Sequence, residues 1–293
     1  MNYVLVNIGQ NPQYVKFTIN SILSVDKDSE IYYLTDTKTQ FKHIKVLNLN
    51  EYENEIIQNL KMMELYKNSN YESNPLWINS LLRVFYLNSF FQRSSIDQLV
   101  HIDNDVLIYK PFKEIESCFD INKLNITQLS ISQLIFSYSY FSNKKILQSI
   151  EDFIFNHIKK NLQNFKELNY RPNEMDLLGR YFFENKNKVN ILNSLPYNLS
   201  KESNYVFDPA SYGQFIGGTH QKPRRFYRLR YFSHHHIVGS EISSKRVKPK
   251  YNLGKPELKF KIGNLQGVSD IVNLHIHSKE LNKYLPLNYR NII

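Results

Sequence analysis

The stretch LVHIDNDVLIYKPF, residues 99–112, places two aspartates at the end of an apolar run. Asp103 and Asp105 are two positions apart, so in an extended segment their side chains point the same way while Asn104 points away. Two carboxylates side by side repel each other unless positive charge lies between them. A calcium loop of the EF-hand type is excluded because apolar residues occupy two of its required positions. The spacing predicts a cation-binding pair, and the alternative is two surface aspartates in a turn.

Strand-like and helix-like segments alternate before this stretch. Helices are expected from Val15 to Leu23, near 51–66 and at 77–91, and buried strands at 3–8, 30–36, 43–49 and 96–102. This alternation predicts an α/β fold with a mostly parallel sheet and helices on both faces. Ligands bind beyond the carboxyl ends of strands in such sheets, where Asn7, Asp36 and Asp103 fall.

A second polar cluster is expected near the C-terminus, in IVNLHIHSKEL, residues 271–281. If this segment is a strand, Asn273, His275 and His277 share one face, with Lys279 just beyond. Two histidines on one face favour metal ligation over a buried structural role. Carboxylate and imidazole together suit Mn²⁺ or a similar divalent ion, and a lysine beside it would face a phosphate.

The composition indicates a globular protein of 293 residues, with 42% hydrophobic residues and a net charge of +10. A chain of this length can bury one large core, or one core with a smaller appendage. The single cysteine excludes an internal disulfide and favours a reducing compartment. No apolar run is long enough to span a bilayer, and the N-terminus resembles a strand and not a signal peptide. A cytoplasmic location is therefore expected.

Much of the positive charge lies in residues 219–262, which hold twelve Lys or Arg against two Glu. Such a segment attracts phosphates, whether of nucleic acid, anionic lipid or a phosphorylated substrate. The alternative is a solvated basic face. Three consecutive histidines at 234–236 are interpreted as a solvated loop and not as a metal site.

Several segments, in this order, resemble the nucleotide-sugar-dependent glycosyltransferases of the GT-A fold, particularly the glycogenin-like and bacterial polysaccharide-assembling ones. The segments span about residues 3 to 280: VNIGQNPQYVKFTINSI, YYLTD, WINSLLRVFYL, LVHIDNDVLIYKPF, RPNEMDLLGRYF, FDPASYGQFIGGTH and LHIHSK. The resemblance implies sugar transfer from a nucleotide sugar by a single GT-A domain over 1–293. That domain would have a nucleotide-binding half at 1–110 and an acceptor half at 111–293. The resemblance also implies a metal site of Asp103, Asp105 and His277, with His275 as the alternative ligand, holding Mn²⁺ or Mg²⁺.

The resemblance further implies how the donor is bound. Asn7 to Gly9 and Asp36 would hold the base and ribose, Lys279 the diphosphate, and Arg83 the phosphates or the D-x-D carboxylates. The full set of implied donor-binding residues is Asn7, Ile8, Gly9, Asp36, Arg83, Asp103, Asn104 and Lys279.

The chain departs from the family pattern in NEMDLL, residues 173–178. Glu174, Met175 and Asp176 stand where the family often has Asp, Gln and Asp, and Met175 cannot hydrogen-bond a sugar as glutamine does. The candidate catalytic carboxylates are Asp208, Asp176 and Glu174. A general base must take the acceptor's proton in an inverting enzyme, yet Asp208-Pro209 could also start a turn and Asp176 could lie on a solvated helix. The stereochemical course stays open.

These observations predict a metal-dependent transfer of a sugar, from a UDP-sugar by resemblance, to a glycan or lipid-linked acceptor. Peripheral contact with the inner face of an anionic membrane is a further hypothesis. One alternative is a nucleotidyltransferase that makes nucleotide sugars, but the first loop lacks the glycine-rich, arginine-containing sequence of that class. Another is a nucleic-acid-binding protein that uses the basic C-terminal third, which would leave the aspartates and histidines without a role.

Overall fold

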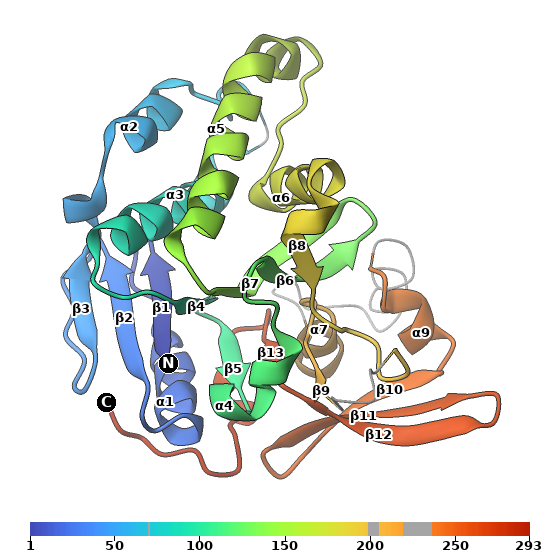
Figure 1. The fold of residues 1–293 in the computed structure, drawn as a ribbon. Helices are drawn as coiled ribbons and strands as arrows, with labels where there is room; N and C mark the ends of the chain where they lie inside the picture. The colour runs from blue at the N-terminus through green and yellow to red at the C-terminus, as the bar shows by residue number, and fades with distance from the viewer. Residues whose placement is uncertain (70, 199–204, 219–235) are drawn as a thin grey trace.

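A computed structural model describes residues 1–69, 71–198, 205–218 and 236–293. Within these residues, the centre of the molecule is a seven-stranded sheet of order β3-β2-β1-β4-β7-β6-β8 (Figure 1). Its strands are β1 Asn2–Asn7, β2 Glu30–Thr35, β3 Lys45–Asn48, β4 Leu99–Ile102, β6 Leu124–Ser130, β7 Gln133–Phe141 and β8 Val189–Ile191.

Strands β3, β2, β1 and β4 run parallel, and β7 is antiparallel to both of its neighbours. The expected α/β fold with a mostly parallel sheet is confirmed. The carboxyl ends of β1, β2 and β4 consequently meet at one edge of the sheet, where the polar residues that follow each strand gather.

Helices cover both faces of this sheet. Successive residues of a strand point to opposite faces, so the apolar strands present side chains for packing on each face. Tyr3 and Leu5 of β1 pack with Ile19 of α1 (Val15–Val25) on one face. Val4 and Val6 point the other way, into the larger core. That core is closed by α2 Glu55–Met62, α3 Leu76–Arg93, α5 Lys144–Glu167 and α6 Glu174–Glu184.

The segment expected to be helical over 51–66 differs in the structure. A 3-10 turn at Leu49–Tyr52 precedes α2, which begins only after Asn54. The Asn54 side chain accepts a hydrogen bond from the backbone N–H of Ile57, so it caps a new helix start. The remaining 3-10 turns are Glu116–Cys118, Lys186–Lys188 and Leu281–Lys283.

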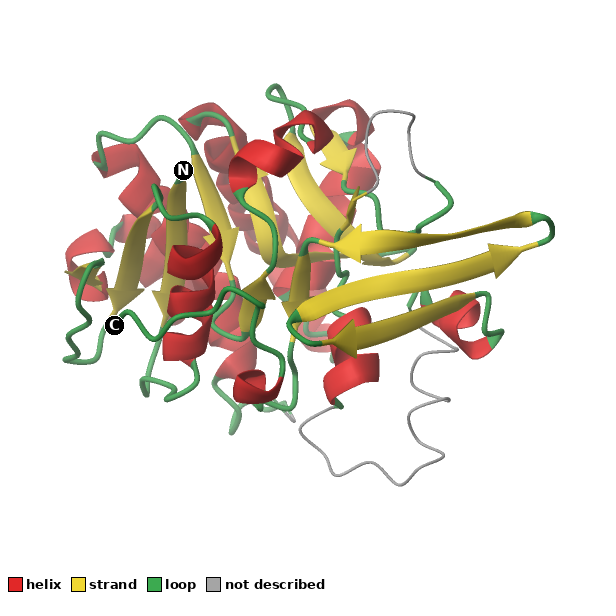
Figure 2. Cartoon of the chain, turned by 90° about the horizontal axis from the view of Figure 1, so that it is seen from below, coloured by secondary structure: helices red, strands yellow, loops and turns green. Residues whose placement is uncertain are grey.

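The C-terminal part adds two smaller sheets. One has the order β10-β11-β12-β9 and projects from the body as a long ribbon (Figure 2). The other pairs β13 with β5. Their strands are β5 Val106–Ile108, β9 Tyr205–Val206, β10 Val247–Asn252, β11 Lys255–Ile262, β12 Leu265–Ile271 and β13 Asn273–His275, and the short helices are α4 Phe112–Ile115, α7 Tyr212–Gly217 and α9 Gly239–Ser243.

None of the helices in the described part of the chain is both long enough and apolar enough to span a bilayer.

Candidate active site

The two aspartates lie in a turn that the C-terminal strand closes. The backbone N–H of Asp103 donates to the carbonyl of Ser137 on β7 (3.0 Å), and the chain then turns into β5. Strand β5 pairs antiparallel with β13 and sets Val106 opposite His275. One residue further, the N–H of Ile276 donates to the carbonyl of Asp105 (2.9 Å). Backbone pairing therefore brings the histidine segment against the aspartate turn.

This pairing creates a compact cluster of opposite charges. The Nε2 atom of His275 is 3.0 Å from Oδ2 of Asp105, and Lys279 Nζ contacts the same oxygen. One potential ligand atom from each of Asp103, Asp105 and His275 lies within 4.8 Å of the others. The three residues are only 8%, 5% and 9% exposed, respectively. Two carboxylates and an imidazole are a donor set suited to Mn²⁺ or Mg²⁺.

The charged groups of the cluster strongly lower the pKa values of its two aspartates. Burial alone would raise the pKa of Asp105, but the charges of His275 and Lys279 outweigh it and hold that pKa well below its usual value. Burial likewise opposes ionisation of Asp103, yet Arg83 and His101 lower its pKa to about 2. Both carboxylates are therefore ionised at neutral pH, as metal ligands must be.

Arg83 of α3 connects the aspartate turn with α6. One guanidinium nitrogen contacts Asp103, and the other lies 3.2 Å from Oε1 of Glu174. Glu174 is buried in the first turn of α6, and its burial raises its pKa in spite of Arg83. The predicted proximity of Arg83 to the D-x-D carboxylates is therefore present in the structure, together with a third carboxylate.

His101 lies against Asp103, a neighbour that the sequence reasoning missed. It is fully buried on β4, its Nδ1 lies 3.0 Å from the carbonyl of Val4, and its Nε2 is 3.4 Å from Asp103 Oδ1. Burial lowers the pKa of His101, which favours the neutral imidazole. Because His101 and Asp103 are two residues apart at the end of one strand, the same spacing rule that paired the aspartates could have found it.

His277 lies beside His275 but outside the three-residue ligand group. The two imidazole rings are 4.2 Å apart between centroids, and Nε2 of His277 is 3.1 Å from the side-chain nitrogen of Gln214 on α7. Tyr14 is a second residue that the sequence reasoning missed, since Lys279 Nζ lies 5.3 Å from its ring centroid. The structure thus places His275 closest to the aspartates and His277 next to it.

Asp208 anchors the segment that carries His275. Its side chain is fully buried, and its two oxygens accept backbone hydrogen bonds from Ser211, Tyr212, Gly213 and His275, at 2.7 to 3.0 Å. Burial raises the pKa of Asp208, and these N–H donors counteract that effect. The carboxylate therefore ties the start of α7 to β13, and the geometry favours the turn interpretation of Asp208-Pro209.

Asp176 and Met175 occupy structural positions on α6. Asp176 forms a capping box with Asn173 and accepts a hydrogen bond from Gln133 (2.9 Å). Met175 packs with Leu129, Ile135 and Ala210 in a small apolar cluster. The position where the family often has glutamine is therefore filled by an apolar contact.

The polar residues after β1 and β2 form a second part of the site. The N–H of Gly9 donates to both oxygens of Asp36 (2.9 and 3.0 Å), and the Asn7 side chain donates to the carbonyl of Gly9 (3.1 Å). The side chain of Asn104 points away from the aspartate carboxylates and donates to Asn7 (3.2 Å). The carbonyl of Ile8 accepts from the side chain of Asn79 on α3 (3.2 Å). A hollow of about 350 Å³ opens beside Asp36, lined by the ends of β2 and β3.

The basic segment is only partly within the described residues. Residues 219–235, including His234 and His235, lie outside them. In the rest, β10 and β11 carry the exposed side chains of Lys248, Lys250, Lys259 and Lys261, and Lys248 stands opposite Lys259 across the two strands.

No protein-family model matches the chain, and no curated protein matches it in sequence. Among solved structures, it is similar to mouse xyloside xylosyltransferase 1 in its apo form, with 9% identity over 66% of this chain and 85% of the other and a TM-score of 0.43. It is also similar to the galactosyltransferase LgtC in complex with donor and acceptor sugar analogues, with 12% identity and a TM-score of 0.44. This match covers 78% of this chain and 82% of LgtC. A third similar structure is the glycosyltransferase GlyE of Streptococcus pneumoniae TIGR4, with 12% identity and a TM-score of 0.41. The match covers 67% of this chain and 46% of GlyE, so the chain spans less than half of GlyE. All three are glycosyltransferases by name, and the similarity is distant.

Proposed function

We propose that this chain is a metal-dependent glycosyltransferase of the GT-A type. It would move a sugar from a nucleotide sugar, with UDP as the preferred nucleotide, to a glycan or lipid-linked acceptor. The observation that carries this proposal is the convergence of Asp103 and Asp105 with His275 and Lys279 at the carboxyl end of β4, although Asp105 and Lys279 are 174 residues apart in sequence. Nucleic-acid binding would leave this cluster without a role, and nucleotidyl transfer is disfavoured because the first loop lacks the glycine-rich, arginine-containing sequence of that class.

The fit of a divalent cation rests on the donor atoms themselves. Asp103, Asp105 and His275 would hold it, and the ring of His277 lies next to that of His275, with 4.2 Å between centroids. Mn²⁺ and Mg²⁺ both accept such ligands and keep positions open for phosphate oxygens. Bound there, the ion would supply positive charge against the diphosphate leaving group.

Lys279 and Arg83 would act on the same leaving group. In the structure each contacts one carboxylate of the pair, so each already lies within reach of the place where negative charge develops. In the reaction the bond from the sugar's anomeric carbon to the diphosphate oxygen breaks, and a bond to an acceptor oxygen forms. Cationic side chains that face the departing oxygen stabilise it in the transition state.

The nucleoside would lie at the ends of β1 and β2. Asp36 accepts the N–H of Gly9 and stands at the rim of the hollow beside β3, so it is placed to hold a base or ribose there. Asn7 shapes the loop from below through its bond to Gly9. The division into a nucleotide-binding half, 1–110, and an acceptor half, 111–293, remains part of this proposal, with His275 and Lys279 of the second half reaching the metal and the diphosphate.

Among the three candidate catalytic carboxylates, we favour Glu174. It is connected to the charge cluster through Arg83, whereas Asp208 is occupied by backbone donors and Asp176 by the cap of α6. A carboxylate at this place can stabilise positive charge on the sugar ring in a retaining enzyme, or accept a proton in an inverting one.

The test is thermal unfolding with UDP, GDP and CMP, each with and without Mn²⁺, on the wild type and on Asp103→Asn. A ligand at about 100 times its Kd adds roughly 2.7 kcal/mol of stability, which is a shift of several degrees for a chain of this size. We expect a shift that requires both UDP and Mn²⁺ and is lost in Asp103→Asn. Asp97→Asn, on the exposed loop before β4, is the matched control and is expected to keep it. No shift with any nucleotide would overturn the proposal.

The exposed lysines of β10 and β11 are the described feature that favours contact with an anionic membrane. We propose this contact as peripheral and at the cytoplasmic face, where lipid-linked acceptors would be reached. In a flotation assay, the wild type is expected to float with vesicles that contain anionic lipid. A smaller fraction of a variant with Lys248 and Lys259 changed to Gln is expected to float with them. Equal flotation with neutral vesicles would contradict the proposal.

A further inference from the structure

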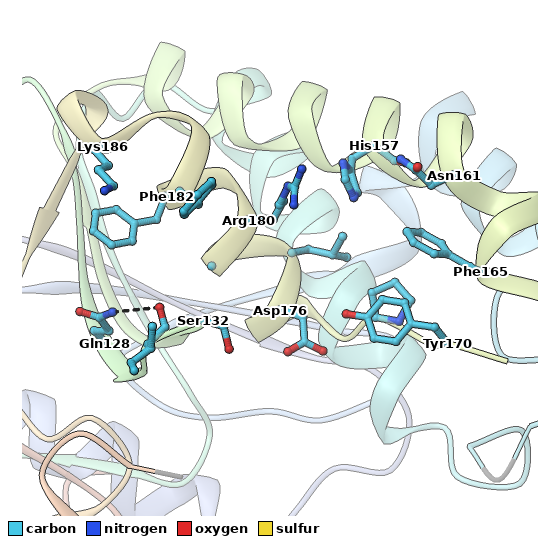
Figure 3. A pocket seen from close by; sticks show the side chains of 15 residues that line it. Gln128, Ser132, His157, Asn161, Phe165, Tyr170, Asp176, Arg180, Phe182 and Lys186 are labelled. Atoms are coloured by element: carbon cyan, nitrogen blue, oxygen red, sulfur yellow. Dashed lines mark hydrogen bonds between the residues drawn. The ribbon is translucent and has the colours of Figure 1, made fainter. Parts of the chain in front are cut away.

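A large cavity lies along α6, apart from the charge cluster. Its volume is about 920 Å³, and it is bounded by α5, by α6 and by the turn between β6 and β7 (Figure 3). Four aromatic rings line it: Phe165, Tyr170, Phe182 and Phe183. None of the residues assigned above to the metal, the diphosphate or the nucleoside contributes to its wall.

Some of these rings remain in contact with water. Phe183 is 69% exposed and Tyr170 is 46% exposed. Tyr170 meets Phe165 edge-on, with 5.5 Å between ring centroids. Exposed apolar rings that border a hollow are features of a binding surface.

Planar polar groups stand between the rings. His157 and Asn161 project from α5, and Asp176 and Arg180 from α6 (Figure 3). Burial and the nearby charge of Arg180 lower the pKa of His157, so this imidazole is neutral at pH 7. Rings that offer flat apolar faces, beside amide, imidazole and guanidinium groups, match sugars, whose C–H faces stack and whose hydroxyls hydrogen-bond.

A second hollow adjoins the first. Its volume is about 390 Å³, and it shares His157, Asn161 and Arg180 with the first and extends to Glu184. From Asp176 to Glu184 the helix rises by about 12 Å. The combined groove is therefore longer than a single sugar ring.

The first turn of α6 connects this groove with the reaction centre. Glu174 contacts Arg83, which contacts Asp103, and Asp176, two residues further on, lines the groove. We propose that the groove along α6 binds a chain of neutral sugar residues, namely the part of the acceptor glycan remote from the reacting hydroxyl. The role of this chain as acceptor rests on the proposed function, whereas the binding of sugars to the groove does not.

The experiment measures the binding of immobilised neutral glycans to the full chain. The panel contains glucans, galactans and N-acetylhexosamine polymers as mono-, di- and tetrasaccharides. The variant is Tyr170→Ala/Phe183→Ala, which removes two exposed rings without opening a buried cavity. Met62→Ala, at the end of α2, is the control because its side chain is 69% exposed, like that of Phe183.

We expect at least one tetrasaccharide to bind the wild type and Met62→Ala more tightly than its monosaccharide does. The double variant is expected to bind it about tenfold more weakly. No binding of any glycan in the panel, or equal binding by the double variant, would overturn the inference. The thermal shift with UDP and Mn²⁺ is recorded for each protein: if that shift is absent but glycan binding depends on the rings, the proposed function fails and the glycan groove stands.

Discussion

Replacing Asp208 with asparagine separates an anchoring role of this residue from a catalytic one. Each carboxylate oxygen accepts two backbone N–H groups: one takes those of Ser211 and Tyr212, the other those of Gly213 and His275. In Asp208→Asn, one oxygen becomes an amide NH₂, which cannot accept. The N–H groups on that side are then left without a partner inside the protein.

The size of the effect follows from this count. Each buried donor left unsatisfied costs about 1–3 kcal/mol, so the loss of two such bonds is expected to lower the free energy of unfolding by about 4 kcal/mol. That is a large share of the 5–15 kcal/mol of a typical domain. If the amide nitrogen takes the place of Oδ2, the bond to the backbone N–H of His275 is one of the two that are lost, and UDP and Mn²⁺ are then also expected to give a smaller thermal shift.

The assay is equilibrium urea unfolding followed by circular dichroism. Asp120→Asn is the control, since Asp120 is partly exposed, accepts a single backbone N–H at 2.9 Å and pairs with Lys123. This control is expected to lose less than about 1 kcal/mol. A loss below about 1 kcal/mol for Asp208→Asn would refute the anchoring role. A stable variant that binds UDP and Mn²⁺ but does not turn over would instead identify Asp208 as the catalytic base.

Three further predictions concern single side chains. Burial raises the pKa of Glu151 on α5, only 2% exposed, from 4.5 to about 6, so its carboxyl destabilises the fold increasingly as pH rises through this interval. The free energy of unfolding of Glu151→Gln, measured with urea, is expected to exceed that of the wild type by up to about 2 kcal/mol near neutral pH and by almost nothing below pH 4.5. The same increase at both pH values would contradict this prediction. Gly213→Ala is expected to abolish the thermal shift with UDP and Mn²⁺, because its Cβ would lie 2.1 Å from the carbonyl oxygen of His275. An unchanged shift would show that α7 can move away from β13. Lys279→Met is expected to tighten Mn²⁺ binding and to weaken UDP binding, each by about tenfold in calorimetric titration. The reason is that the lysine neutralises Asp105 until a phosphate is present. Weaker binding of both ligands would contradict this prediction.

The sequence was informative wherever the determinants are local. The order of strands and helices in the first hundred residues followed from apolar periodicity, and the break near Asn54 was missed because a single capping side chain decides it. The two-residue spacing of Asp103 and Asp105 predicted a shared orientation, and both carboxylates belong to one cluster. Their surroundings could be anticipated only through the resemblance.

The parts of the site that depend on pairing between distant segments could not be predicted from the sequence. Whether His275 or His277 is nearer the aspartates depends on the register of β13 against β5, which no local pattern encodes. The burial of Asp208 depends on α7 folding back onto β13, so Asp208-Pro209 looked equally like a base and a turn. The groove along α6 arises from the way three elements meet, and none of them carries a recognisable motif.

The pairing of β5 with β13 also has a consequence for synthesis of the chain. Lys279 and Asp105 are 174 residues apart in sequence, which at ribosomal speeds corresponds to roughly 10–35 s. Asp103 meets Arg83 early, since both belong to the first part of the chain, whereas Asp105 has to wait for the last strand before it gains a counter-charge. A nascent chain can therefore assemble its parallel sheet while the charge cluster is still incomplete, and protein released before about residue 280 would fold around an uncompensated carboxylate. Such truncated products are expected to be targets of proteolysis because a buried charge without a partner destabilises the fold.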